Sequence, residues 1–290
     1  MFIATLIAEG LGAGDLSAAA DRLAAADCAP GAWRWLDEGK AADLEFARHS
    51  DLARGALEGA FAATDVIVQP AAGREKRLLI ADMDSTMITV ECIDELADYA
   101  GIKAQIAEVT ERAMRGELDF AEALDARVGL LKGLEESAID RCLAERVRLS
   151  PGARTLVQTM RARGALTILV SGGFTRFAGP VGEMIGFARV IANRLEIAGG
   201  ALTGTVEKPI VDSSTKETTL LGAAAELGLP LEATLAVGDG ANDLAMIRKA
   251  GLGVAYHAKP IVAAAAGARV DHGDLSALLY AQGIARAEWR

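Results

Sequence analysis

The chain has 290 residues, 51% of them hydrophobic, and a formal net charge of −10. This is enough for about two domains with substantial cores. Nucleic-acid binding needs a basic face, so the charge argues against it and requires local cations to hold any anionic substrate. Cys28, Cys92 and Cys142 lack metal-ligand spacing, so we expect buried free thiols in a reducing cytoplasm.

Membrane and export signals are not evident in the sequence. No apolar run approaches the roughly 18 residues of a membrane span. Residues 1–8 contain neither a basic region nor a small-residue cleavage site. We therefore expect no membrane partner and no signal peptide.

Residues 1–74 are predicted to form a small α/β unit of their own. Its expected elements are two outer strands, two helices and a short strand whose tryptophans pack on the sheet: 2–7, 65–68, 16–25, 51–62 and 33–36. Residues 70–76 are rich in turn formers and charges, and are predicted to be a linker.

An acidic motif, Asp82-Met83-Asp84-Ser85-Thr86, follows the apolar run 78–81, which is typical of a buried strand. Ligands in open α/β sheets bind at this end of the strands. Asp82 and Asp84 are expected in one crevice, where two carboxylates repel each other unless a metal or phosphate chemistry uses them. The pair alone is also typical of a solvated turn, so the other motifs must decide.

Residues 89–150 are predicted to be a helical insert directly after this motif. Apolar residues recur there at helical spacing, and strand signals are missing. From residue 150 onward the strand–helix alternation of a parallel sheet resumes. One interruption, 194–197 and 201–206 around Gly199-Gly200, predicts a hairpin.

Three more signals follow strand-like runs or open a helix. They are Ser171-Gly172-Gly173 after 166–170, Lys216 within an apparent capping box Ser214-Thr215-Lys216-Glu217, and Gly238-Asp239-Gly240-Ala241-Asn242-Asp243 after 234–237. A cation in a first helical turn opposes the helix dipole by ~0.3–1 kcal/mol. The position of Lys216 is therefore understandable if its ammonium meets acids and a phosphate.

The signals at Asp82, Ser171, Lys216 and Asp239, in this order, resemble the haloacid dehalogenase superfamily of phosphatases and phosphotransferases over residues 77–275. The resemblance implies an α/β fold, a Rossmann-like parallel sheet with a helical cap insertion. The predicted domains are 1–74 and 75–290, with the cap at 89–150. The N-terminal unit resembles a small ACT-like regulatory domain. A packing or dimerisation module fits it equally well, so a homodimer is an open expectation.

The catalytic roles follow from the chemistry of the acids together with this resemblance. Asp82 is the candidate nucleophile, which would form an aspartyl phosphate. Asp84 would protonate the leaving oxygen and then activate water. The crowded carboxylates predict Mg²⁺ as cofactor, held by the side chains of Asp82 and Asp239 and, as the resemblance implies, by the backbone carbonyl of Asp84.

The remaining motif residues are candidates for binding the substrate. The hydroxyl of Ser171 and the backbone of Gly172 suit phosphate oxygens, as expected for a loop at a helix N-terminus. Lys216 would bind the phosphate and Asn242 the phosphate or substrate. Asp243 is assigned to support of the metal site.

Glu91 and residues 119–128 resemble the phosphoserine phosphatase family. There the first helical segment supplies a glutamate and the cap an arginine, which fall on Glu91 and Arg127, with Met114 and Phe120 as an apolar wall. A zwitterionic substrate needs an anion for its ammonium and a forked cation for its carboxylate. Without this resemblance, both charges are typical of solvated helix positions.

The sequence thus predicts an enzyme, a Mg²⁺-dependent hydrolase that converts the small molecule O-phosphoserine to serine and phosphate, the last step of serine biosynthesis. One alternative is a phosphotransferase that passes the phosphoryl group from Asp82 to another alcohol, such as homoserine. An alternative of another class is a catalytically idle amino-acid sensor. Joint retention of Asp82, Asp84, Lys216 and Asp239 argues against the sensor, because a sensor needs no nucleophile.

Overall fold

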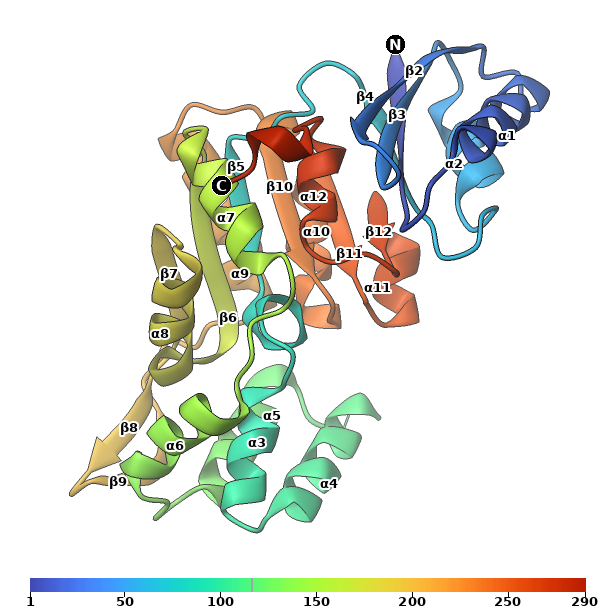
Figure 1. Cartoon of the computed structure of the whole chain (residues 1–290). Helices are drawn as coiled ribbons and strands as arrows, with labels where there is room; N and C mark the ends of the chain where they lie inside the picture. The colour runs from blue at the N-terminus through green and yellow to red at the C-terminus, as the bar shows by residue number, and fades with distance from the viewer. Residues whose placement is uncertain (116) are drawn as a thin grey trace.

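The computed structural model describes residues 1–115 and 117–290, except the side chain of Met114. It contains a four-stranded sheet, a six-stranded sheet and a two-stranded hairpin (Figure 1). The two larger sheets lie side by side, and the hairpin lies with a group of helices at the opposite end of the molecule. Within the described residues, no helix is both long and apolar enough to cross a membrane.

The N-terminal unit alternates strands and helices. Its elements are β1 (Phe2–Ile7), α1 (Ala13–Ala25), β2 (Pro30–Asp37), β3 (Ala41–Phe46), α2 (Ser50–Leu57) and β4 (Asp65–Pro70). The strand order is β2-β3-β1-β4 and the paired strands run antiparallel, which is the ferredoxin-like arrangement. Apolar residues of both helices pack on one face of this sheet. The α/β class predicted for this unit is confirmed.

Several local predictions for this unit need correction. Strand β3 was not expected, and α2 ends at Leu57 and not at residue 62 because Glu58 leaves the helical conformation. Only one of the two tryptophans of β2 packs as predicted: Trp35 contacts the core of the unit, whereas Trp33 is 40% exposed.

The predicted linker, residues 70–76, is held in place by buried side chains. Arg74 donates to both carboxylate oxygens of Asp43, at 2.7 and 2.9 Å, and to the backbone oxygens of Tyr280 and Ala281. Lys76 is buried and donates to the carbonyl of Glu232. This segment therefore joins the first sheet to the C-terminal part of the chain. The domain boundary at residues 74 and 75 stays a prediction.

The six-stranded sheet is parallel throughout, in the order β12-β11-β10-β5-β6-β7. Its strands are β5 (Leu78–Ala81), β6 (Leu166–Phe174), β7 (Arg189–Asn193), β10 (Thr234–Gly238), β11 (Leu252–Tyr256) and β12 (Ala268–Val270). Leu79 and Ala81 belong to one core cluster and Leu78 and Ile80 to another, so both faces of the sheet are covered. This explains why the strand sequences are continuous apolar runs.

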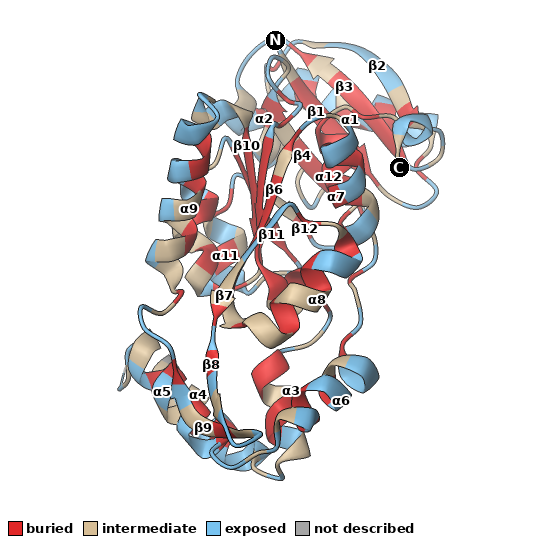
Figure 2. Cartoon of the chain, turned by 90° about the vertical axis from the view of Figure 1, so that its left-hand side faces the viewer, coloured by how far each residue is buried: buried red, intermediate tan, exposed pale blue. Residues whose placement is uncertain are grey.

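Helices cover the two faces of this sheet (Figure 2). One face carries α7 (Ala153–Ala162), α8 (Thr175–Ile185) and α12 (Ala277–Ala281), and the other α9 (Ser213–Glu226), α10 (Leu244–Lys249) and α11 (Pro260–Ala265). Short turns of helix occur at Met83–Met87, Leu231–Ala233, Ala241–Asp243 and Arg286–Glu288. The predicted Rossmann-like sheet is therefore confirmed.

The predicted insert forms a group of helices beyond the C-terminal ends of the strands, which we call the cap (Figure 1). Its helices are α3 (Cys92–Tyr99), α4 (Lys103–Met114), α5 (Phe120–Leu130) and α6 (Glu136–Arg146). The hairpin of β8 (Leu195–Ala198) and β9 (Ala201–Val206) packs against α5. Gly199 and Gly200 both have positive φ, 60° and 80°, as a tight two-residue turn requires.

Candidate active site

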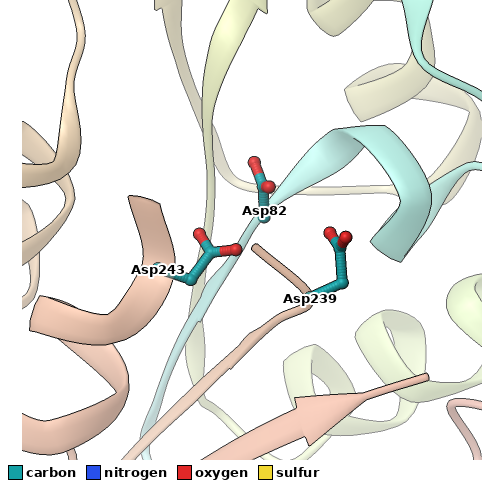
Figure 3. Close-up of side chains that lie close together, drawn as sticks. All are labelled: Asp82, Asp239 and Asp243. Atoms are coloured by element: carbon teal, nitrogen blue, oxygen red, sulfur yellow. The ribbon is translucent and has the colours of Figure 1, made fainter. Parts of the chain in front are cut away.

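Three aspartates converge where β5 and β10 end (Figure 3). Asp82 follows β5, Asp239 follows β10, and Asp243 lies at the start of α10. One carboxylate oxygen from each lies within 4.8 Å of the others. Since β5 and β10 are parallel neighbours, their C-terminal ends must share one edge, which explains how residues 157 positions apart meet.

Lys216 holds this cluster together from behind. It is fully buried, and its Nζ lies 2.6 Å from an oxygen of Asp82 and 2.6 Å from an oxygen of Asp243. Burial alone would lower the pKa of Lys216, but the two carboxylates outweigh it and raise this pKa. The lysine therefore stays an ammonium and orients Asp82.

The helix that carries Lys216 begins earlier than predicted. Its N-cap is Asp212, whose carboxylate accepts a hydrogen bond from the backbone of Thr215 at 2.9 Å. The proposed capping box from Ser214 to Glu217 is thus wrong, because an aspartate two positions upstream satisfies the free N–H groups first. Lys216 lies one turn into the helix and points into the protein, not at its surface.

Asp243 has a structural role that its two oxygens define. One accepts from Lys216, and the other accepts from the backbone N–H of Gly240 at 3.0 Å. A Cβ at Gly238 would lie 2.3 Å from the Asp243 carboxyl carbon, so only glycine fits there. The loop between β10 and α10 is therefore folded around Asp243, whereas its support of the metal site stays a prediction.

Asp84 lies in the crevice beside Asp82. Its carboxylate accepts from the backbone N–H of Cys92 at 3.2 Å, and a Cβ at Gly173 would approach it to 2.9 Å. Burial raises the pKa of Asp84 to about 7, and the charge of Glu91 adds to the effect. A carboxyl group with such a pKa can give and take a proton near neutral pH.

Asp239 and Asp82 fit a hard divalent cation. Thr86 donates to one oxygen of Asp239 at 3.1 Å and Lys216 to one oxygen of Asp82, so each carboxylate retains a second oxygen. Burial and the charge of Asp243 raise the pKa of Asp239 to about 6, and the same two causes raise that of Asp82. A bound Mg²⁺ would relieve this crowding, because it prefers carboxylate oxygens.

Ser171 and Gly172 lie at the end of β6, and the prediction of their setting was only partly correct. The strand continues to Phe174 with an irregular register, and α8 begins at Thr175, so these residues belong to a strand end and not to a helix N-terminus. The Ser171 hydroxyl accepts from the backbone N–H of Gly173 at 2.9 Å. A Cβ at Gly172 would lie 3.1 Å from the ring of Phe120 in the cap.

A cavity of about 520 Å³ lies between the sheet and the cap. Eight of the predicted site residues line it: Asp82, Asp84, Glu91, Arg127, Ser171, Gly172, Asp239 and Asn242. The ninth, Lys216, lies behind Asp82. Phe120 contributes an apolar wall, whereas the side chain of Met114 lies outside the described part. The structure thus gathers residues from three strand ends, those of β5, β6 and β10, and from the cap helices α3 and α5 around one space.

The cap residues Glu91 and Arg127 are oriented by short local contacts. Glu91 accepts from the hydroxyl of Ser85 at 2.6 Å, and Arg127 donates through Nε to the carbonyl of Ala123 at 3.1 Å. That bond uses one donor of the guanidinium and leaves its two terminal nitrogens for a ligand. The site therefore presents an anion and a forked cation to the same cavity.

Sequence reasoning missed one residue that organises the site. Asn193, buried at the end of β7, donates to the carbonyl of Gly172 at 2.8 Å and accepts from the backbone N–H of Val211 at 2.7 Å. It thereby ties the Ser171 strand end to the segment that leads to Lys216. An asparagine that ends a mostly apolar run was the available signal, but nothing local distinguished it from a turn former.

The profile of the haloacid dehalogenase-like hydrolase family matches residues 79–248. The chain belongs to this family, as its sheet, cap and acidic cluster indicate. It is 48% identical over 236 residues to a phosphoserine phosphatase of Streptomyces coelicolor, and 46% identical over 217 residues to phosphoserine phosphatase SerB2 of Mycobacterium tuberculosis. These matches cover 80% and 75% of the chain but only 57% and 53% of the relatives, so the chain spans little more than half their length.

Another relative is matched over most of its length. A phosphoserine phosphatase of Polaromonas is 46% identical over 208 residues, which are 70% of this chain and 88% of that protein. Among solved structures, a HAD family hydrolase from Salmonella enterica superposes with a TM-score of 0.86 at 28% identity, covering 97% of this chain and 98% of the other. A probable phosphoserine phosphatase from Vibrio cholerae gives a TM-score of 0.78 at 33% identity, covering 99% and 87%.

Proposed function

We propose that this protein hydrolyses O-phosphoserine to serine and phosphate in a Mg²⁺-dependent reaction, in the cytoplasmic synthesis of serine. The observation that carries the proposal is the shared cavity of Asp82, Glu91 and Arg127. It combines a nucleophile, an anion for an ammonium and a forked cation for a carboxylate. The names of the relatives support the same substrate.

The proposed reaction has two displacement steps at phosphorus. A carboxylate oxygen of Asp82 attacks, the bond to the serine oxygen breaks, and Asp84 gives its proton to that oxygen. Asp84 then takes a proton from a water molecule that attacks the aspartyl phosphate, and Asp82 is released. The position of Asp84 and its pKa of about 7 suit this exchange of roles.

Charge compensation explains the other residues of the site. Asp82 and Asp239, with the Asp84 carbonyl, would hold Mg²⁺, which neutralises phosphate charge when bound. Lys216 stabilises the ionised form of Asp82, and the strand end at Ser171 and Gly172 would bind phosphate oxygens together with Asn242. Asp243 acts indirectly, because Lys216 and the loop backbone occupy both of its oxygens.

The test is phosphate release from a panel of small phosphomonoesters, each with Mg²⁺ and with a chelator. We expect phosphoserine to be the best substrate and the chelator to abolish activity. An acid quench should trap a hydroxylamine-labile phosphoryl group on the peptide that carries Asp82, and the Asp82→Asn variant should not form it. The same reaction should be run with phosphoserine labelled in its phosphate group, with and without homoserine. Release of serine and phosphate in equal amounts in both cases would exclude phosphotransfer, whereas labelled phosphohomoserine as the main product would contradict hydrolysis.

A further inference from the structure

The cavity is strongly acidic, although the proposed substrate carries a phosphate dianion. Among the described residues, five carboxylates line it: Asp82, Asp84, Glu91, Asp94 and Asp239. The cationic side chains in the same lining are Arg127 and Lys259. Lys216 lies behind Asp82 and is already paired with Asp82 and with Asp243, which does not line the cavity. Since the whole chain has a net charge of −10, the long-range field also repels an anion.

Lys259 occupies the edge of this cavity. It follows β11, directly before Pro260 and α11, and its backbone N–H donates to the carbonyl of Asp239 at 3.2 Å. Its side chain is exposed, and within the described part of the chain no carboxylate lies within 4.0 Å of its ammonium. The ammonium is nevertheless close enough to Asp239 to oppose the rise of that pKa.

The local sequence gives no structural reason for a lysine there. As the residue before the first turn of α11, Lys259 places a cation at the positive end of a helix, which costs ~0.3–1 kcal/mol. Its ammonium has no acceptor and so cannot cap the helix, and its side chain is not packed in the core. A cation at this place is favourable only with respect to the carboxylates of the cavity and to an anion that enters it.

We propose that Lys259 is a positioning residue that attracts the phosphate dianion to the mouth of the acidic cavity. The proposal rests on the proposed function only in requiring a phosphomonoester, not in requiring serine. Lys259 acts in capture and not in the chemical step, because the buried Lys216, and not Lys259, holds Asp82. A solvent-exposed charge acting on a dianion should change kcat/KM by about 3- to 10-fold at low ionic strength.

The experiment compares Lys259→Gln with Lys249→Gln at ionic strengths from about 10 to about 300 mM, across which screening becomes strong. Lys249 is a matched control: it is an exposed lysine at the end of α10, near Glu217 at 3.9 Å, and it does not line the cavity. The substrate is p-nitrophenyl phosphate, which shares only the phosphate with phosphoserine. We expect Lys259→Gln to lower kcat/KM at low salt, to leave kcat within about twofold of wild type and to converge with wild type at high salt.

Two further measurements keep the proposal falsifiable. Lys259→Arg should restore the salt dependence, since it restores the charge, and the inhibition constant of inorganic phosphate should rise in Lys259→Gln only. A loss confined to kcat, a loss independent of salt, or an equal loss in Lys249→Gln would overturn the proposal.

The same design separates this proposal from the proposed function. If p-nitrophenyl phosphate shows the Lys259 effect but phosphoserine is not preferred, the substrate assignment fails and the role of Lys259 stands. If no phosphomonoester is hydrolysed, the proposed function fails. The role of Lys259 is then tested by itself, by comparing the affinities of wild type and Lys259→Gln for inorganic phosphate in calorimetry.

Discussion

Replacing Arg127 by alanine should separate recognition of the substrate carboxylate from phosphate chemistry. Arg127 lies on α5 in the cap, and its Nε already donates to the Ala123 carbonyl. The terminal nitrogens are the part of the guanidinium that faces the shared cavity in our proposal. Asp82 and Lys216 are positioned by the sheet and by α9, so the variant leaves them in place.

The size of the effect follows from the bonds that are lost. A charge-assisted hydrogen bond in a closed site contributes ~1.5–3 kcal/mol, which corresponds to a loss of roughly 10- to 150-fold in kcat/KM for phosphoserine. Arg127→Lys keeps the charge but loses the planar fork, so an intermediate loss is expected. Phosphoethanolamine lacks the carboxylate, and its hydrolysis should change by less than about threefold in either variant.

The assay is kcat/KM for wild type and each variant on both substrates, at fixed Mg²⁺. Arg141→Ala serves as control, because Arg141 is an exposed cap arginine on α6 that donates to the Ser137 hydroxyl and does not line the cavity. Glu91→Gln should show the complementary pattern, with phosphoserine affected more than phosphoglycolate, which lacks the ammonium. Equal losses on all substrates would refute the reasoning and would mean that these residues close the cap or support the phosphate site.

Three further predictions concern the buried charges. Asp82→Asn should release no phosphate yet melt within a few degrees of wild type, because the amide keeps the shape of the carboxylate; substantial activity would contradict the covalent mechanism. The pKa of Asp239 is raised in the folded state from its usual 3.8 to about 6, so its stabilising contribution is complete below about pH 4 and is lost as pH rises through about 6. Metal-free Asp239→Asn should therefore gain about 2 kcal/mol relative to wild type between about pH 4 and about pH 7, measured by urea unfolding, and a constant difference would refute this. Arg74→Ala should cost about 3–5 kcal/mol because it leaves Asp43 buried beside a single exposed arginine. Arg34→Ala, which removes that exposed partner, should cost less than about 1 kcal/mol, and similar losses in the two variants would contradict the assignment.

Local chemistry made much of the site predictable from the sequence. A strand that is buried on both faces must be apolar along its length. The apolar run 78–81 therefore predicts the strand, and the first polar residue after it, Asp82, marks its C-terminal end. The same argument applies to Thr234–Gly238 before Asp239. The hairpin was equally predictable, because Gly199 and Gly200 are residues that adopt positive φ without strain. The helical cap was predictable as well, because apolar residues recur at helical spacing along residues 89–150.

The tertiary structure alone determined the contacts between residues that are remote in sequence. Lys216 and Asp243 are 27 positions apart, and only the packing of α9 against α10 brings them to 2.6 Å. Arg74 meets Asp43 and the carbonyl of Tyr280 across the junction of the two sheets, so a segment that is locally typical of a linker becomes buried. No local pattern encodes these pairings.

The role of each polar residue was decided in the same way. Asn193 and Lys259 occupy unremarkable positions in the sequence, at the end of a strand and before a short helix respectively. They gain significance because parallel strands bring their C-terminal ends to one edge, where Asn193 binds the backbone of Gly172 and Lys259 lines the cavity. Sequence determines which groups are available at each strand end, whereas the order of strands in the sheet determines which of those groups meet.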